Sequence, residues 1–262
     1  MWNADRLRRE QNSCVDVWKV PLCWTTAGFE HLAGLLSKEE AERASQIGSK
    51  PMRDTFIVAR AALRCLLGRY LHCAPSTIGF SCQLHGKPRV SADTSLCFSA
   101  SRSGNLALFA FSENTALGID IERLRLVPNM ERVVERMFSP DEKLQLHQLP
   151  RYEQERAFFA CWTRKEAYAK AIGSGLLTPF ENFSVDVTPD EPKPRIRFED
   201  SPAAPQSWVL HSLSGADGYA AAIAYHGTER ALSTFNVNSA DELIAAGSSI
   251  RFAGNSEGDG LA

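Results

Sequence analysis

The chain has 262 residues and a mass of 28.9 kDa, which corresponds to one large or two compact domains. Hydrophobic residues make up 44% of it and charged residues 23%, so the composition favours a globular protein and argues against a disordered or fibrous one. The formal net charge of −2 argues against a surface that coats nucleic acid, and no apolar run approaches the roughly 20 residues that span a bilayer.

The cysteines and the N-terminus favour a cytoplasmic protein. Seven cysteines are scattered without a C-x-x-C pair, which is typical of reduced thiols rather than of disulfides or a zinc site. The opening sequence MWNADRLRRE is polar and lacks the apolar core of a secretory signal. We therefore expect a cytoplasmic location, with neither a membrane nor a nucleic acid as partner.

Apolar periodicity and turn signals predict the elements of the first part of the chain. Residues 14–20 alternate apolar and polar side chains and predict a strand. Ser37 and Glu40 have the spacing of a capping box, so we expect a helix that begins there and ends near residue 44. Residues 54–71 predict a long apolar helix with arginines, residues 77–83 a strand, and residues 96–112 a hairpin.

The second part follows a similar order. Residues 117–124 predict a strand, and residues 129–138 and 156–173 predict helices. The strands expected after them are residues 183–187, 194–198, 208–213 and 218–225, of which the last two pair across a turn.

A helix followed by an apolar hairpin thus occurs twice, which predicts an α+β fold. We expect two similar α/β halves related by a pseudo-twofold axis, with the active site in the cleft between them. The N-terminal half would span residues 1–114 and the C-terminal half residues 115–226. The pattern is lost beyond that point, so we expect residues 227–262 to form an irregular tail.

Basic residues are concentrated between positions 43 and 89, where Asp54 is the only acid. This favours a small polyanionic ligand, and the alternative is a solvated helix face. A further cation, Arg102, lies among serines at the predicted hairpin turn, where it can hold a phosphate or be merely exposed. The basic residues of the stretch are Arg43, Lys50, Arg53, Arg60, Arg64, Arg69, Lys87 and Arg89.

Two carboxylates mark the predicted strand 117–124. Asp120 and Glu122 are two residues apart and share one face, while Ile119 and Ile121 point to the other. Carboxylates on one face repel each other unless a cation lies between them, and Mg²⁺ prefers such oxygen ligands. The alternative is a strand edge that faces solvent.

The predicted helix 156–173 contributes a third carboxylate. Trp162, Glu166 and Lys170 are spaced by four residues and therefore share one face. A carboxylate and an ammonium beside Mg²⁺ suit a pyrophosphate, and the alternative is an ordinary Glu–Lys pair on a helix.

These motifs resemble, in order and spacing, those of the surfactin-synthetase-activating (Sfp-type) 4′-phosphopantetheinyl transferase family. They are GKP at residues 86–88, SRSG at 101–104, GIDIE at 118–122 and WTRKEAYAK at 162–170. The resemblance extends from about Cys14 to Tyr225. It implies transfer of 4′-phosphopantetheine from coenzyme A to a serine of an apo acyl, peptidyl or aryl carrier protein, with release of 3′,5′-ADP. Such enzymes serve fatty acid, polyketide or nonribosomal peptide biosynthesis.

The resemblance also implies roles for individual residues. Mg²⁺, or Mn²⁺ in its place, would be held by Asp120, Glu122 and Glu166. Glu166 and Lys170 would act in catalysis, Glu166 as metal ligand, as base or as both. The family often has His where this chain has Arg102, which keeps a cationic contact to phosphate. Because both halves lie in one chain, we expect a monomer. The residues expected to bind coenzyme A are Arg43, Arg60, Arg64, Lys87, Pro88, Ser101, Arg102 and Lys170.

The segment that follows the acidic strand is the expected docking surface for an acidic carrier protein. It combines Arg123, Arg125, Arg132 and Arg136 with Leu126, Val127 and Met130. The alternative is that these arginines pair with Glu131 and Glu135 on a solvated helix.

Two other functions would use the same residues. One is a catalytically silent sensor of coenzyme A or a nucleotide, although the intact acids at positions 120, 122 and 166 argue against it. The other is a Mg²⁺-dependent phosphohydrolase, in which water takes the place of the serine.

Overall fold

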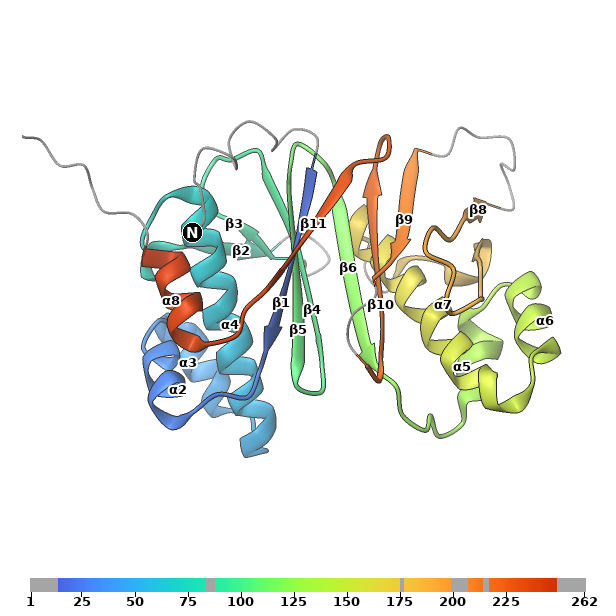
Figure 1. Cartoon of the computed structure of the whole chain (residues 1–262), viewed down its shortest axis with the longest axis horizontal. Helices are drawn as coiled ribbons and strands as arrows, with labels where there is room; N and C mark the ends of the chain where they lie inside the picture. Colours follow the sequence, from blue (N-terminus) through green and yellow to red (C-terminus); the bar gives the residue numbers. More distant parts are fainter. Residues whose placement is uncertain (1–13, 83–87, 175–176, 199–206, 214–216, 249–262) are drawn as a thin grey trace, which may run out of the picture. The chain divides into compact units, whose positions relative to one another are not determined.

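The structure, a computed structural model, describes residues 14–82, 88–174, 177–198, 207–213 and 217–248 (Figure 1). The chain divides into two compact units. The first holds the described residues up to Cys23 together with Gly79–Val237, and the second holds Trp24–Ile78 and the described residues from Asn238 onward. The predicted α+β class is confirmed. The expected boundary between residues 114 and 115 falls inside the first unit, and the pseudo-twofold relation stays a prediction.

Four strands of the first unit form a sheet in the order β11-β1-β5-β4. β1 (Cys14–Pro21) and β4 (Leu96–Ser103) both pair antiparallel with β5 (Leu106–Glu113), and β11 (Ala231–Asn236) pairs in parallel with β1. The predicted hairpin is thus confirmed as β4–β5, and its turn contains Gly104 with a φ of 55°. A separate short pair consists of β2 (Phe80–Cys82) and β3 (Pro88–Val90).

A second sheet of the first unit has the order β6-β10-β9. Its strands are β6 (Leu117–Arg123), β10 (Tyr219–His226) and β9 (Trp208–Ser212), and the predicted pairing of the last two is confirmed. Ile119 and Ile121 of β6 are buried in one core with Val15 and Val17 of β1. The other face of β6 lies against the long helix α7 (Arg151–Ile172) (Figure 1).

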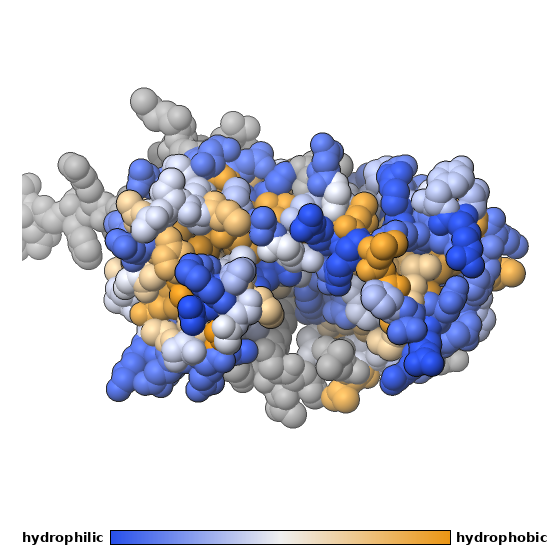
Figure 2. Space-filling view, turned by 90° about the horizontal axis from the view of Figure 1, so that it is seen from below, coloured by the Kyte–Doolittle hydropathy of each residue, from blue (hydrophilic) through white to orange (hydrophobic). Residues whose placement is uncertain are grey.

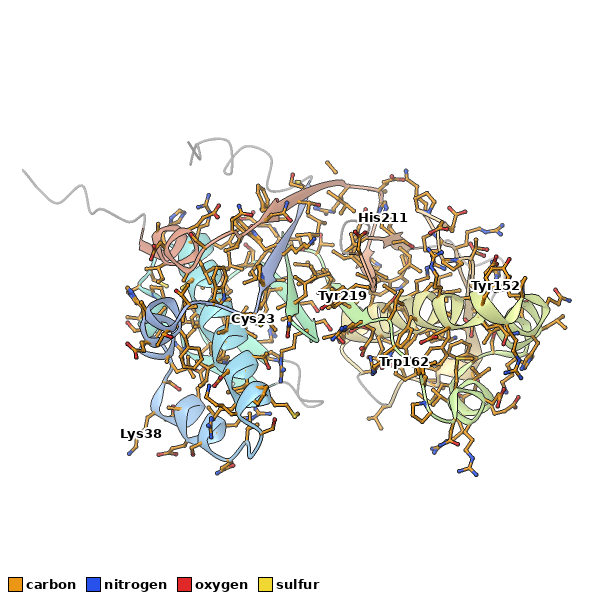
Figure 3. The ribbon with its side chains drawn as sticks, turned by 60° about the horizontal axis from the view of Figure 1, so that its bottom comes forward. Cys23, Lys38, Tyr152, Trp162, His211 and Tyr219 are labelled. Atoms are coloured by element: carbon orange, nitrogen blue, oxygen red, sulfur yellow. The ribbon has the colours of Figure 1, made fainter. Side chains whose placement is uncertain are left out.

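An aromatic core holds α7 in place. It joins α7 to α5 (Met130–Met137), α6 (Pro140–Gln148), the 3₁₀ turn η3 (Phe180–Asn182), β7 (Phe183–Val185) and β8 (Ile196–Phe198). Phe158 is stacked against Phe138 at 5.5 Å between ring centroids and against Trp162 at 6.2 Å. Trp162, labelled in Figure 3, therefore contributes its ring to this core.

A fully buried ion pair lies in the same core. Lys165 of α7 and Glu142 of α6 both have 0% exposed side chains, and Nζ lies 2.8 Å from Oε2. The ammonium also donates to the backbone oxygens of Phe180 (2.8 Å) and Phe183 (2.6 Å). Glu142 accepts from the backbone N–H of Val185 at 2.7 Å. These additional hydrogen bonds meet the condition under which burial of two charges is tolerated.

The described part of the second unit consists of helices and turns. Its elements are α2 (Thr26–Ala33), α3 (Lys38–Ser45), α4 (Lys50–Leu71), the 3₁₀ turn η1 (Pro75–Thr77) and α8 (Ala240–Ser248), which packs on α4. The predicted capping box is confirmed, since Ser37 N donates to Glu40 Oε2 (2.8 Å) and Glu40 N donates to Ser37 Oγ (3.3 Å).

The prediction of an irregular tail from residue 227 was wrong for its described part. β11 extends the first sheet, and α8 packs against α4. Both elements are short, and their partners lie near the other end of the chain, so the local pattern did not reveal them. The short elements α2, α6 and β3 were missed for the same lack of a long periodic pattern. Residues 249–262 lie outside the described part.

The surface is mostly hydrophilic on the face shown in Figure 2, where apolar side chains lie in small groups. Among the described residues, no helix has both the length and the apolar character needed to cross a membrane. The large apolar side chains that are exposed are Met52, Leu126, Leu144, Tyr152, Ile172 and Leu177.

Lys165→Met should lower the free energy of unfolding by about 3–5 kcal/mol, because it leaves Glu142 as a buried charge without its partner. Urea denaturation followed by circular dichroism measures this loss. The matched control is Lys143→Met, since Lys143 pairs with Glu135 where the side chains are 24% and 65% exposed. The control should lose less than about 1 kcal/mol. Equal losses in the two variants would contradict a structural role for the buried pair.

Candidate active site

The three acids predicted as metal ligands lie within electrostatic reach of one another in the first unit. Asp120 and Glu122 belong to β6, and Glu166 belongs to α7. Burial raises the pKa of Asp120, and the nearby charge of Lys170 partly offsets this effect. Burial also raises the pKa of Glu166, and the negative charges of Asp120 and Glu122 raise it further. The negative charge of Glu122 therefore destabilises the ionised form of Asp120, and the charges of Asp120 and Glu122 destabilise that of Glu166.

A glycine brings the helix onto the acidic strand. A Cβ atom on Gly118 would collide with backbone atoms of Ala167, Lys170 and Ala171. The backbones of β6 and α7 are therefore in direct contact at this point, two residues before Asp120. Any side chain at position 118 would push the helix away from the strand.

Lys170 reaches back from α7 to the same strand. Its Nζ donates to Asp120 Oδ1 (2.7 Å), Ser101 Oγ (3.0 Å) and the backbone oxygen of Ile119 (3.2 Å). Ser101 itself donates to Asp120 Oδ1 at 2.7 Å. Three residues of the predicted site, on three different elements, thus meet at one carboxylate.

A row of serines on β4 extends this arrangement. Alternate serines face β6 and bind it through their hydroxyls: Ser99 accepts from Ile119 N (3.1 Å), Ser101 donates to Asp120, and Ser103 donates to Glu122 Oε2 (2.7 Å). The intervening Arg102 is exposed, and strand alternation turns it to the opposite face. Our sequence analysis missed Ser99 and Ser103, although the S-x-S-x-S alternation in the predicted hairpin was the available signal.

Glu122 has a second partner from the segment expected to dock a carrier protein. Arg125 Nη1 donates to Glu122 Oε2 at 3.1 Å, and its guanidinium lies 5.5 Å from the ring centroid of Phe159. Arg125 is 57% exposed, so it forms the outer rim of the acidic site.

The acids provide the ligand chemistry of Mg²⁺. Within the described ranges, no group of three or more His, Cys, Asp or Glu side chains is arranged to hold a metal ion. Asp120 Oδ2, however, is buried with no hydrogen-bond partner among the described residues. A buried carboxylate oxygen without a partner is costly, and a cation would satisfy it. The oxygen-only donors and their mutual repulsion fit Mg²⁺, while Lys170 lies at the other oxygen of Asp120.

Two of the arginines expected to bind coenzyme A form an internal network of the second unit. Arg64 is 2% exposed and donates to Glu40 Oε2 (2.7 Å) and the backbone oxygens of Pro75 (2.9 Å) and Ile78 (3.1 Å). Arg60 pairs with the same Glu40 and is 21% exposed. This burial favours a structural role for Arg64.

The other residues expected to bind coenzyme A have fewer described contacts. The guanidinium of Arg43 lies 5.7 Å from the ring centroid of Phe56 in the second unit. Pro88 begins β3 and is partly buried. Lys87 lies outside the described residues.

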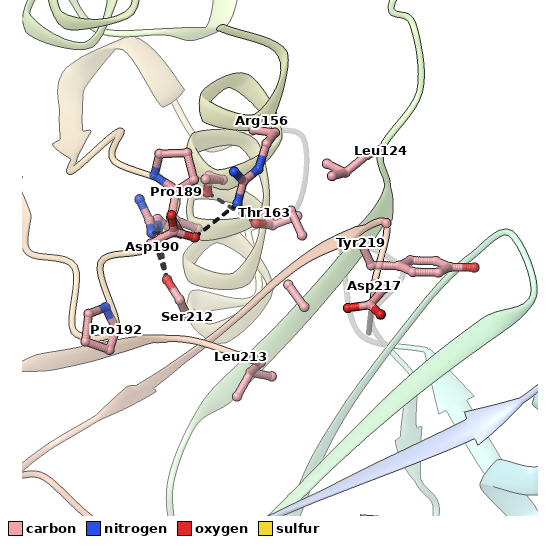
Figure 4. A pocket seen from close by; sticks show the side chains of 15 residues that line it. Leu124, Arg156, Thr163, Pro189, Asp190, Pro192, Ser212, Leu213, Asp217 and Tyr219 are labelled. Carbon is pink, nitrogen blue, oxygen red and sulfur yellow. Dashed lines mark hydrogen bonds and ion pairs between the residues drawn. The ribbon is translucent and has the colours of Figure 1, made fainter. Parts of the chain in front are cut away.

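A recess of about 520 Å³ borders α7 between Arg156 and Arg164, but none of the three acids lines it (Figure 4). Arg164, at this recess, donates to four backbone oxygens of the segment 186–191 and to Ser212 Oγ (2.8 Å). Arg156 pairs with the exposed Asp190 at 3.1 Å. Arg164 therefore fastens a loop to the helix, a role that our sequence analysis did not assign.

Comparison with known proteins identifies the family. Residues 116–224, which include β6, α7, β9 and most of β10, match the model of the 4′-phosphopantetheinyl transferase superfamily. The chain is 35% identical over 216 residues to the 4′-phosphopantetheinyl transferase HetI of Nostoc, covering 81% of this chain and 88% of that protein. The chain belongs to the 4′-phosphopantetheinyl transferase superfamily. It is also 29% identical over 161 residues to the 4′-phosphopantetheinyl transferase Sfp of Bacillus subtilis, covering 62% of this chain and 70% of that protein. The predicted family and enzyme class are confirmed.

Among solved structures, a holo-(acyl-carrier-protein) synthase from Bacillus anthracis in complex with CoA (3′,5′-ADP) matches with a TM-score of 0.35 and 23% identity. The match covers 44% of this chain and 96% of that chain. A likeness at this level carries no argument about the present site.

Gly118→Ala should lower the melting temperature and reduce phosphopantetheinyl transfer at least about tenfold, because the added methyl group displaces Glu166 and Lys170 from β6. The matched control is Gly48→Ala, since a Cβ at Gly48 meets no atom within 4 Å. Thermal denaturation and a transfer assay compare the two variants. A fully active Gly118→Ala variant would show that close strand–helix contact is dispensable.

Proposed function

We propose that Asp120, Glu122, Glu166 and Lys170 carry out the transfer of 4′-phosphopantetheine from coenzyme A to a serine of an apo carrier protein. The observation that carries this proposal is the convergence of β4, β6 and α7 on Asp120, whose second oxygen is buried without a partner. Such a site suits an anionic pyrophosphate held between a metal ion and an ammonium group.

In the reaction, the serine Oγ forms a bond to the phosphorus atom that bears pantetheine. The bond between this phosphorus and the bridging oxygen of 3′,5′-ADP breaks, and the nucleotide leaves with that oxygen. The serine proton passes to Glu166, directly or through water. Burial and neighbouring charge raise the pKa of Glu166, which makes its ionised form a stronger base than an ordinary glutamate.

Asp120, Glu122 and Glu166 would hold Mg²⁺, with Mn²⁺ as a substitute. When bound, the metal ion would neutralise the charge of the pyrophosphate and of the departing nucleotide. Ser103 and Arg125 orient Glu122 through its Oε2 atom. Lys170 and Ser101 would supply hydrogen-bond donors to the phosphate oxygens in place of the bonds that they donate to Asp120 Oδ1.

The remaining contacts of coenzyme A are assigned to Arg43, Lys87, Pro88 and Arg102. Arg60 is kept as a further candidate, because its side chain is 21% exposed although it pairs with Glu40. Arg102 is exposed and cationic, which suits the 3′-phosphate. We leave Arg64 out of this set because its guanidinium is buried on Glu40 and two backbone carbonyls.

The carrier protein would dock beside the end of β6. Leu126 is 85% exposed next to Arg125, and Arg132 and Arg136 are exposed on α5. Exposed apolar and cationic groups suit the acidic surface expected around the modified serine. A monomeric state and a cytoplasmic location stay predictions.

The deciding experiment incubates the protein with coenzyme A, Mg²⁺ and an apo carrier protein, and measures the intact mass of the carrier. A mass gain equal to phosphopantetheine, with release of 3′,5′-ADP, supports the transfer. Cleavage of coenzyme A without a mass gain would instead support a phosphohydrolase, and neither change would support a sensor.

Asp120→Asn should reduce turnover at least about 100-fold, because it removes a metal-binding charge without changing the shape of the side chain. It should also abolish the rise in melting temperature that Mg²⁺ gives the wild type. The control is Asp190→Asn, whose side chain is 83% exposed and lies on the recess that the acids do not line. Near-wild-type turnover of Asp120→Asn would remove this residue from the site.

Glu166→Gln should reduce turnover at least about 100-fold, the lower range for the loss of a general base. Binding of coenzyme A, measured by calorimetry, should change less because Lys170 and the arginines remain. The control is Glu229→Gln, which alters an exposed pair with Lys193. Lost affinity for coenzyme A with unchanged turnover at saturation would make the assignment of Glu166 as base wrong.

A further inference from the structure

The Lys170 ammonium is saturated by the enzyme's own acceptors. Its three donors are matched by Asp120 Oδ1, Ser101 Oγ and the backbone oxygen of Ile119, at 2.7, 3.0 and 3.2 Å. A lysine has no further N–H group to offer. The ammonium must therefore give up at least one of these contacts before it can hold a phosphate oxygen.

The same ammonium also competes with a metal ion. Its positive charge is 2.7 Å from an oxygen of Asp120, whose side chain is only 6% exposed. At such a distance, in a site screened from water, a divalent cation on this carboxylate is repelled by the lysine. Lys170 is itself 28% exposed, so its flexible side chain has room to move toward solvent or a bound anion.

We infer that Lys170 couples the metal ion to the coenzyme: it occupies Asp120 while the site lacks a phosphate, and moves to the pyrophosphate when coenzyme A binds. This inference rests on the proposed function. Without coenzyme A, the lysine weakens the binding of the metal ion. With coenzyme A, the lysine leaves Asp120, so the metal ion and the coenzyme each strengthen the binding of the other, as linkage requires.

Mn²⁺ titration followed by electron paramagnetic resonance tests the coupling without any turnover. In the absence of coenzyme A, Lys170→Met should bind Mn²⁺ at least about tenfold more tightly than the wild type, because the competing charge is gone. Lys170→Gln keeps hydrogen-bonding groups, and it should show the same tightening even if the Met variant folds poorly. The control is Lys193→Met, a lysine in an exposed pair with Glu229, which should leave Mn²⁺ affinity unchanged.

Addition of coenzyme A provides the second half of the test. Coenzyme A should increase the Mn²⁺ affinity of the wild type. The fold-increase in affinity should be at least about tenfold smaller in Lys170→Met, because no lysine has to be displaced there. Mn²⁺ affinity that is unchanged or weaker in both lysine variants without coenzyme A would overturn the inference. If Mn²⁺ affinity does not rise in either variant but the wild type transfers phosphopantetheine, the inferred role of Lys170 is wrong and the proposed function stands. If the wild type gives no mass gain on any apo carrier, the proposed function fails instead.

Discussion

The buried ion pair between Lys165 and Glu142 fixes the rotation of α7, on which the active site depends. Successive helix residues are turned by about 100°, so Glu166 cannot share the environment of its neighbour Lys165. Lys165 is held between Glu142 of α6 and the backbone oxygens of Phe180 and Phe183. Glu166 is therefore directed away from that core, toward Asp120 and Glu122 of β6. A buried pair adds little stability over apolar packing. We therefore infer that the main role of the pair is to orient α7 rather than to stabilise the fold.

That orientation becomes functional where α7 meets β6. At Gly118 the two backbones touch, and within the next turn of α7 Lys170 bonds to Asp120. Ser101 and Ser103 of β4 bind the two carboxylates of the same strand. The groups that join these three elements are thus the groups proposed to act on the substrate, so damage to the packing and damage to the chemistry are hard to separate without matched controls.

The sequence was sufficient for the elements with long or alternating patterns and for the acids carried on them. Strand alternation correctly separated Asp120 from Ile119 and Ile121. It could not show that Lys165 is buried, because burial of a charge depends on Glu142, which lies far along the chain and belongs to the unpredicted α6. The sequence pattern likewise made Arg64 a candidate for binding coenzyme A, although Glu40 supplies a partner for it inside the protein. The predictions differ from the structure mainly where a residue's partner lies far away in the sequence, because local propensity carries no information about such pairs.

Charge balance supports the proposal that the acidic site would need a metal ion in order to hold a pyrophosphate. Asp120, Glu122 and Glu166 outnumber Lys170 and Arg125, so the fully ionised cluster keeps an excess of one negative charge. An anionic coenzyme would be repelled by that excess. A divalent cation would reverse its sign, and the inferred movement of Lys170 from Asp120 to the pyrophosphate would then place a second cation against the coenzyme. Burial is the main cause of the raised pKa values of Asp120 and Glu166, and the negative charge of the neighbouring acids adds to it, so a cation bound at the site would relieve part of the same cost.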